Sequence, residues 1–221
     1  MKNVLTTAIL CALLQPIFAQ KIIEKHFASS PSKLVSMNIQ IADSISIIAW
    51  NKNEVYVKAS IDVNDNQAND DYKVNFDETN DAISIKSKFE FEKGKNCCGT
   101  STNCNCNCNC QSHITCVVYV PENANFSVET INGNIIISGK TAQIRAHTIS
   151  GFIDISLDPA TKAGLKMRTI SGTMYSNFDF DPDKGLRHRG GSAIETVLNG
   201  GGDKSIDLET ISGDIFFRKQ S

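Results

Sequence analysis

Apolar and polar residues alternate along most of this chain. Apolar side chains occupy every second position from Ile45 to Ile47, again from Val55 to Val63, and again from Ile114 to Val120. Because successive side chains of a β-strand point to opposite faces, this period of two predicts strands with one buried face. No window of 12 residues has the 3.6-residue period of a helix. We therefore predict an all-β chain.

A four-residue phrase, Thr-Ile-Asn-Gly or Thr-Ile-Ser-Gly, recurs in the second half of the sequence. It begins at Thr130, Thr148, Thr169 and Thr210, so the spacings are 18, 21 and 41 residues. Alternating apolar residues flank each copy, which predicts a strand, a tight turn and a second strand. We expect the small polar residue to bond its own backbone and the glycine to permit a positive φ. The predicted turn residues are Asn132, Gly133, Ser150, Gly151, Ser171, Gly172, Ser212 and Gly213.

Two architectures fit this pattern. A recurrence near 20 residues favours a β-solenoid, in which each coil stacks on the coil before it and the phrase forms one corner of every coil. A turn of this composition between alternating strands is also found in the hairpins of an antiparallel β-sandwich. The number and spacing of the copies favour the solenoid, and the sandwich is the alternative.

The first 19 residues have the layout of a secretory signal peptide, with a basic start, a short apolar core and Ala19 at the end. The polar residues 20–33 are expected to be a leading arm, and residues 34–221 a single β-repeat domain. The signal core is shorter than the roughly 20 apolar residues of a spanning helix. No other segment predicts a transmembrane span. We expect an exported protein that is periplasmic, on the outer surface or secreted.

The overall charge argues against one class of partner. The chain has 22 Lys and Arg against 24 Asp and Glu, a formal net charge of -2. Domains that bind nucleic acid usually present a strongly basic surface. No nucleic-acid partner is expected.

Three stretches carry motifs that can be compared with known families. Residues 50–55 (WNKNEV) follow an Ile-rich strand, residues 118–135 join a strand and a PENANF turn to the first phrase, and residues 199–215 join a glycine-rich turn to the last phrase. Together they resemble the DUF4097 family, an adhesin-type domain also called toastrack. The resemblance implies an extracytoplasmic β-helix-like domain without established catalytic residues. It implies a surface-binding or structural role, with an envelope or extracellular protein or a polysaccharide as partner.

A cysteine-rich insertion at residues 92–112 departs from that family pattern. Seven of the eight cysteines follow the signal peptide, and outside the cytoplasm they are candidates for disulfides. Alternate positions of a straight strand are about 6.6 Å apart, near the upper limit for bridging, so partners on an opposing strand fit better. Because seven is odd, at least one thiol stays free or pairs between chains, and Cys116 is the candidate for a buried free thiol. The disulfide candidates are Cys97, Cys98, Cys104, Cys106, Cys108 and Cys110.

The same six cysteines offer an alternative function as a soft-metal site. With His113 as a nitrogen ligand, their thiolates have the ligand types that bind Zn²⁺ or Cu(I). The Cys-x-Cys spacing differs from that of zinc fingers, and oxidation competes with metal binding. Disulfides and metal both remain open, and no other cofactor is expected.

The sequence contains no recognisable catalytic motif. Asp154, Asp207 and Asp214 lie on separate predicted strands and would be the acid–base candidates if the chain were a β-helix enzyme acting on carbohydrate. An Asp on the solvent face of a strand is the more ordinary case. We therefore expect a non-catalytic protein, with the carbohydrate-active enzyme as a further alternative.

Overall fold

The computed structural model describes residues 20–90, 111–179 and 191–220, and these residues form strands with one short 3-10 turn, η2 (Asn69–Asp71). The all-β prediction is confirmed. The proposed signal peptide and the six cysteines between residues 97 and 110 lie outside the described residues. The strands before the cysteine-rich insertion are β1 (Lys21–Ala28), β2 (Leu34–Ile39), β3 (Ile41–Trp50), β4 (Glu54–Val63), β5 (Tyr72–Glu78) and β6 (Ala82–Phe89). Those after it are β7 (Ser112–Pro121), β8 (Phe126–Ser138), β9 (Ile144–Ser150), β10 (Ile153–Leu157), β11 (Ala163–Ser171), β12 (Met174–Ser176), β13 (Ser192–Leu198), β14 (Ser205–Ser212) and β15 (Ile215–Lys219).

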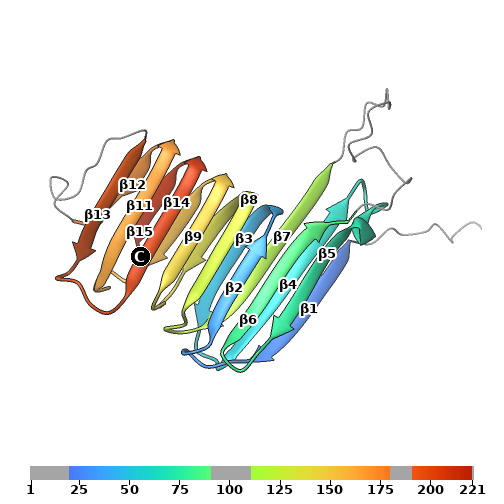
Figure 1. Cartoon of the computed structure of the whole chain (residues 1–221), viewed down its shortest axis with the longest axis horizontal. Helices are drawn as coiled ribbons and strands as arrows, with labels where there is room; N and C mark the ends of the chain where they lie inside the picture. The colour runs from blue at the N-terminus through green and yellow to red at the C-terminus, as the bar shows by residue number, and fades with distance from the viewer. Residues whose placement is uncertain (1–19, 91–110, 180–190, 221) are drawn as a thin grey trace, which may run out of the picture.

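The strands lie side by side along an elongated molecule and form two facing layers (Figure 1). Layer 1 contains, in spatial order, β1, β4, β7, β3, the second half of β8, β10, β15 and β12. Layer 2 contains β5, β6, β2, the first half of β8, β9, β14, β11 and β13. Because β8 takes part in both layers, the hydrogen bonding of the fifteen described strands is continuous, and the sheet is open rather than closed.

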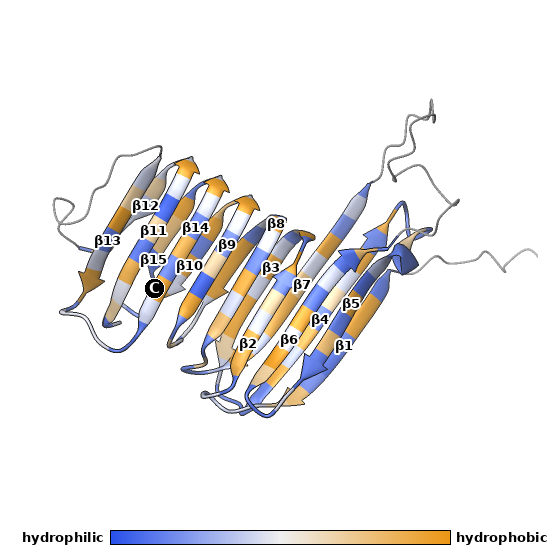
Figure 2. Cartoon of the chain, viewed as in Figure 1, coloured by the Kyte–Doolittle hydropathy of each residue, from blue (hydrophilic) through white to orange (hydrophobic). Residues whose placement is uncertain are grey.

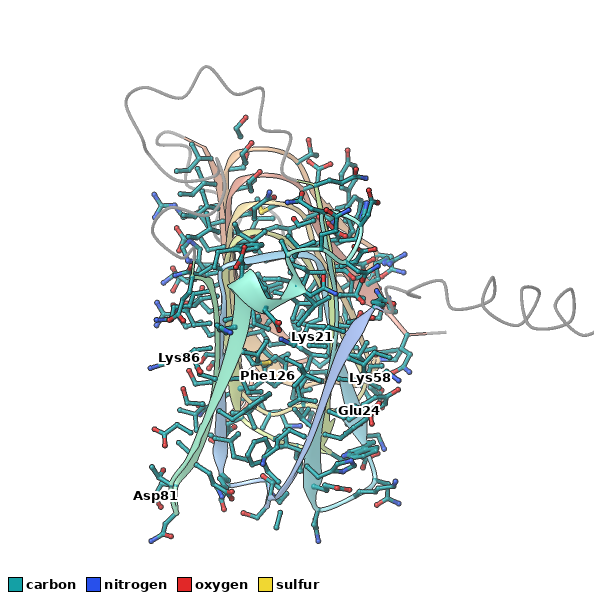
Figure 3. The ribbon with its side chains drawn as sticks, turned by 90° about the vertical axis from the view of Figure 1, so that its right-hand side faces the viewer. Lys21, Glu24, Lys58, Asp81, Lys86 and Phe126 are labelled. Carbon is teal, nitrogen blue, oxygen red and sulfur yellow. The ribbon has the colours of Figure 1, made fainter. Side chains whose placement is uncertain are left out.

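The alternation of the sequence becomes the difference between the inside and the outside of these layers. Hydrophobic and hydrophilic bands alternate along the strands in Figure 2. In Figure 3, Glu24 and Lys58 project from the outer side of layer 1 and Lys86 from that of layer 2, whereas Phe126 lies between the layers. Phe126 is only 2% exposed and belongs to one continuous apolar core.

The strand pairings combine features of both predicted architectures. In the middle of the molecule five coils, each with one segment in each layer, pair in parallel: β2–β3, β8, β9–β10, β14–β15 and β11–β12. Antiparallel pairs stand at the ends, where β4 lies between β1 and β7, β5 pairs with β6, and β13 pairs with β11. The two layers face one another as in a sandwich, and the parallel coils are those expected of a solenoid.

The expectation that each coil stacks on the coil before it in sequence is wrong for the coil β11–β12, which pairs with β14–β15 rather than with β9–β10. β14 pairs with β9 on one side and with β11 on the other, so the coil β14–β15 lies between two coils that precede it in the chain. Residues 197–200, which resemble a weaker copy of the phrase, end the antiparallel strand β13 and lead into the turn before β14.

Charged side chains on the outer face of layer 2 give a physical reason for this order. In the observed register Asp207 of β14 is paired with Arg145 of β9 on one side and with Lys166 of β11 on the other. If β11 stacked directly on β9 with the phrases aligned, Arg145 would face Lys166. Opposite charges across neighbouring strands stabilise a sheet, whereas like charges destabilise it. The inserted coil thus separates two basic strands with an acidic one.

The segment expected as a leading arm contains a strand of the fold. β1 pairs antiparallel with β4 along its whole length. Its alternation is hard to recognise because Ile22 is 53% exposed and only Phe27 on the opposite face is fully buried. An edge strand needs only a few inward apolar residues, and the sequence pattern is correspondingly weak.

Candidate binding surface

The four phrases lie at the corners where the chain passes from layer 2 to layer 1. Their threonines are buried, and each hydroxyl donates a hydrogen bond to a backbone carbonyl of the neighbouring coil. Thr148 donates to Gly133 at 3.1 Å, and Thr210 donates to Gly151 at 3.1 Å. Thr169 donates to Gly213 at 3.0 Å, and Thr130 donates to Gln40 at 3.3 Å. The threonines therefore join adjacent coils at every corner.

The glycines of the phrases are required mainly by close approach of neighbouring corners. A Cβ atom added to Gly151 would lie 2.2 Å from the carbonyl oxygen of Gly133, and one added to Gly172 would lie 1.9 Å from that of Gly213. A Cβ atom added to Gly133 would lie 2.8 Å from the carbonyl oxygen of Ala42, and one added to Gly213 would lie 2.0 Å from that of Gly151. Of the four, only Gly151 and Gly213 have a positive φ. The expectation that the glycine permits a positive φ therefore holds at two of the four corners. A side chain at any of these four glycines would therefore meet backbone atoms of the neighbouring corner.

The predicted metal and disulfide residues are only partly within the described chain. His113 is there, at the start of β7, with its Nδ1 3.4 Å from a carboxylate oxygen of Asp43 and its Nε2 3.0 Å from the amide nitrogen of Gln111. Within the described residues no group of three or more His, Cys, Asp or Glu could hold a metal ion. Cys116 is a free, buried cysteine as expected, and burial raises the pKa of its thiol to about 12.

The three aspartates considered as catalytic candidates are not brought together. Asp154 in layer 1 forms a bidentate ion pair with Arg218. Asp214 accepts a hydrogen bond from the backbone N–H of Thr173 at 2.8 Å. Asp207 lies on the outer face of layer 2, on the opposite side of the molecule. The core therefore lies between Asp207 and Asp154, and Asp214 lies at the corner between β14 and β15.

An aromatic patch lies on the outer face of layer 1 and consists of His26, Trp50, Tyr56 and Tyr119. Strand register brings these side chains together, since Tyr56 of β4 is paired with His26 of β1 and with Tyr119 of β7. The ring centroids are 4.5 Å apart for His26 and Tyr56, 5.8 Å for Tyr56 and Tyr119, and 4.9 Å for Tyr119 and Trp50. Trp50 is held in place by a 2.8 Å hydrogen bond from its Nε1 to the carbonyl of Glu54. The result is a row of rings across four neighbouring strands.

Charged groups surround the aromatic patch. The ammonium of Lys52 lies 4.3 Å from the ring centroid of Trp50, within the range of a cation–π interaction. The Nζ atom of Lys58 lies 3.1 Å from Oε1 of Glu24. The Lys58 ammonium, together with the hydroxyl of Tyr56, lowers the pKa of the Glu24 carboxyl. Desolvation and the hydrogen bond to Glu24 raise the pKa of the Tyr56 hydroxyl. The patch therefore has an apolar centre and a rim of ionised donors and acceptors.

Sequence reasoning missed this patch, although part of the signal was present. Tyr56 and Tyr119 each lie between two valines that alternate inward, so both were predictable as outward-facing aromatic residues. An outward aromatic ring combines a large contact area with a polar group, which makes it a candidate for a binding surface. What the sequence did not contain was the register that sets β1, β4 and β7 side by side.

The described residues contain no helix with the length and hydrophobicity that crossing a bilayer requires.

Comparison with known proteins identifies the fold rather than a family. No family model and no curated protein matches the sequence. A solved structure described as a putative cell adhesion protein from Clostridium sporogenes is similar over 91% of this chain and 100% of its own, with a TM-score of 0.50 and 13% identity. A putative adhesin from Bacteroides fragilis covers 91% of this chain and 98% of its own at a TM-score of 0.31 and 6% identity, too low to carry an argument. The chain thus shares its overall fold with the solved structure from Clostridium sporogenes.

Proposed function

We propose that this protein is an exported, non-catalytic surface module of adhesin type that binds a polysaccharide through the aromatic patch. The fold similarity to a cell adhesion protein over 91% of the chain supports the adhesin class. The aromatic patch supports the choice of partner and is the observation that carries the proposal.

The chemistry of the patch suits a sugar polymer. A pyranose ring has an apolar C–H face that packs on aromatic rings and hydroxyls that need polar partners at the edge. Tyr56, Tyr119 and Trp50 supply the aromatic surface, while Glu24 and Lys58 supply an acceptor and a donor beside it. Aromatic residues of this kind dominate the energetics of recognition because they bury a large area with few rotatable bonds.

Affinity electrophoresis of the mature chain through gels containing defined polysaccharides tests the proposal. We expect retardation in at least one gel, and we expect Tyr119→Ala to weaken it strongly, since loss of an aromatic anchor typically costs about 2 kcal/mol or roughly 30-fold in affinity. Tyr175→Ala is the matched control, because Tyr175 is 49% exposed and lies on β12 at the other end of layer 1. Equal retardation of the wild type, Tyr119→Ala and Tyr175→Ala would contradict the role of the patch.

We also propose that the five parallel coils are a short β-solenoid of DUF4097 type. The recurring corners, with their buried threonines and closely packed glycines, support this assignment. Its flat outer faces would then be the surfaces available for binding.

Soft-metal binding is a second proposal, and one observation favours it. His113 directs Nδ1 toward the carboxylate of Asp43 at 3.4 Å, and a histidine ligand commonly has such a carboxylate behind it. Native mass spectrometry of protein purified without oxygen would detect bound Zn²⁺ or Cu(I). We expect any such metal to disappear when residues 97–110 are deleted, and a fully oxidised, metal-free protein would refute the idea.

A further inference from the structure

We propose that the outer face of layer 2 binds a second copy of this chain, face to face, about a two-fold axis that runs parallel to the strands between β9 and β14. This inference does not depend on the polysaccharide proposal, because the aromatic patch lies on the outer face of layer 1.

The first observation is a row of exposed isoleucines. The residue after each inward threonine of the phrase is an isoleucine, and these side chains are between 37% and 50% exposed. They lie on adjacent coils, and the arrowheads of β9, β14 and β11 are accordingly coloured as hydrophobic side by side in Figure 2. Single exposed apolar residues are ordinary on a protein surface, but a contiguous row marks an interaction site. The isoleucine row consists, in spatial order, of Ile131, Ile149, Ile211 and Ile170.

Two further rows of side chains run beside the isoleucine row on the same face. The near row, two residues before each isoleucine, consists of Glu129, His147, Glu209 and Arg168. The far row, two residues earlier again, consists of Ser127, Arg145, Asp207 and Lys166. All of these positions are exposed or half-buried, so the three rows form a flat grid of apolar and charged side chains.

The proposed two-fold axis makes this grid complementary to itself. The rotation keeps each row opposite the same row of the partner but reverses the order of the strands. β9 then faces the partner's β14, and β8 faces the partner's β11. In an isologous interface every such contact occurs twice. The facing pairs are Ile149 with the partner's Ile211, Ile131 with the partner's Ile170, Arg145 with the partner's Asp207, His147 with the partner's Glu209, Glu129 with the partner's Arg168 and Ser127 with the partner's Lys166.

The alternative symmetric arrangements lose this complementarity. A two-fold axis in the stacking direction, along the near row, would place each near-row residue opposite its own copy, so that Glu129 faces the partner's Glu129 and Arg168 the partner's Arg168. A shift of the axis onto β14 would place Arg145 opposite the partner's Lys166. Like charges brought together in this way disfavour an arrangement. The charge pattern therefore selects one register.

The size of the contact predicts a weak dimer. With strands about 4.8 Å apart and alternate residues about 6.6 Å apart, six overlapping strands and three rows cover roughly 600 Å² on each copy. This area is below the typical value of about 800 Å² per partner in a stable complex. We expect a dimer whose population rises with protein concentration.

Sedimentation velocity of the mature chain over a wide concentration range tests the proposal. We expect monomer and dimer in exchange, and we expect Ile149→Ser to raise the dissociation constant at least tenfold. Ile136→Ser is the matched control, because Ile136 is 37% exposed but lies on the outer face of layer 1, and this change should leave the dimer intact. A monomer at every concentration would overturn the proposal, as would equal effects of the two substitutions.

A charge exchange tests the register. Glu129 and Arg168 are separated in one chain by β9 and β14, so their pairing is expected only between copies. Glu129→Arg alone and Arg168→Glu alone should each weaken the dimer at least fivefold, and the double exchange should restore it. A double variant that associates as weakly as either single variant would refute this register. Circular dichroism of each variant checks that the fold is unchanged.

Discussion

Gly151 offers the most direct test of how the coils are held together. It lies at the corner between β9 and β10 with a φ of 143°, and a Cβ atom there would be 2.2 Å from the carbonyl oxygen of Gly133. Gly151→Ala therefore introduces a methyl group where backbone atoms already occupy the space. Because the obstacle is backbone rather than the end of a side chain, the two corners must move apart.

The cost of this movement follows from two contributions. Overpacking a close-packed site typically costs about 1–3 kcal/mol. The displaced carbonyl of Gly133 also accepts the hydrogen bond of the buried Thr148 hydroxyl at 3.1 Å, and leaving buried polar groups unpaired costs about 1–3 kcal/mol. We expect Gly151→Ala to lower the free energy of unfolding by about 2–6 kcal/mol, the sum of these two ranges, which in a chain of this size corresponds to a decrease in Tm of about 4–24 °C.

Urea denaturation and thermal unfolding, both followed by circular dichroism, measure this change. Gly164→Ala is the matched control, since Gly164 lies within β11 and the nearest atom to an added Cβ is the carbonyl oxygen of Lys204, 4.0 Å away. This variant should be neutral or slightly more stable, because alanine restricts the unfolded chain. If both variants have the same free energy of unfolding, close approach is not the reason for the glycine.

The remaining predictions concern a buried hydroxyl, a buried phenol and the order of the coils. Thr210→Val removes the donor to the Gly151 carbonyl and should cost about 1–2 kcal/mol in urea unfolding, whereas Thr115→Val at an exposed position should be neutral. Burial raises the pKa of Tyr72 to about 12. The neutral phenol therefore contributes its full stabilisation below pH 10, and this contribution is lost as the pH rises through about 12. A Tyr72→Phe variant that loses stability over this range as steeply as the wild type would contradict the assignment. Asp207→Lys places a third positive charge between its two basic neighbours and should cost about 1 kcal/mol at low salt and less at high salt; an effect independent of salt would exclude an electrostatic origin.

Much of the fold was predictable because it depends on local rules. Alternation has a period of two wherever a strand has one buried face, and the phrase identified all four corners. The role of its threonine was less visible. Alternation places Thr148 inward and Thr115 outward, but it does not show that the Thr148 hydroxyl bonds the carbonyl of Gly133. That bond depends on which coil lies alongside.

The order of the coils and the binding surfaces were not predictable for the same reason. The place of β14 depends on pairing Asp207 with two basic strands that are distant in sequence, and the aromatic patch depends on the register of β1, β4 and β7. A single sequence contains no direct record of such long-range register. The charges that explain the order could be interpreted only after the neighbours were known.

The inserted coil has a consequence for how the chain reaches its fold. Residues 205–219 are synthesised after β11 and β12, yet they separate those strands from β9 and β10. While the chain emerges, β11 therefore has no final neighbour on its β9 side, and stacking in simple order would have to be undone. Long-range pairings of this kind form slowly. For an exported protein, as proposed above, this order means that the stack of coils cannot close before residues 205–219 have been delivered.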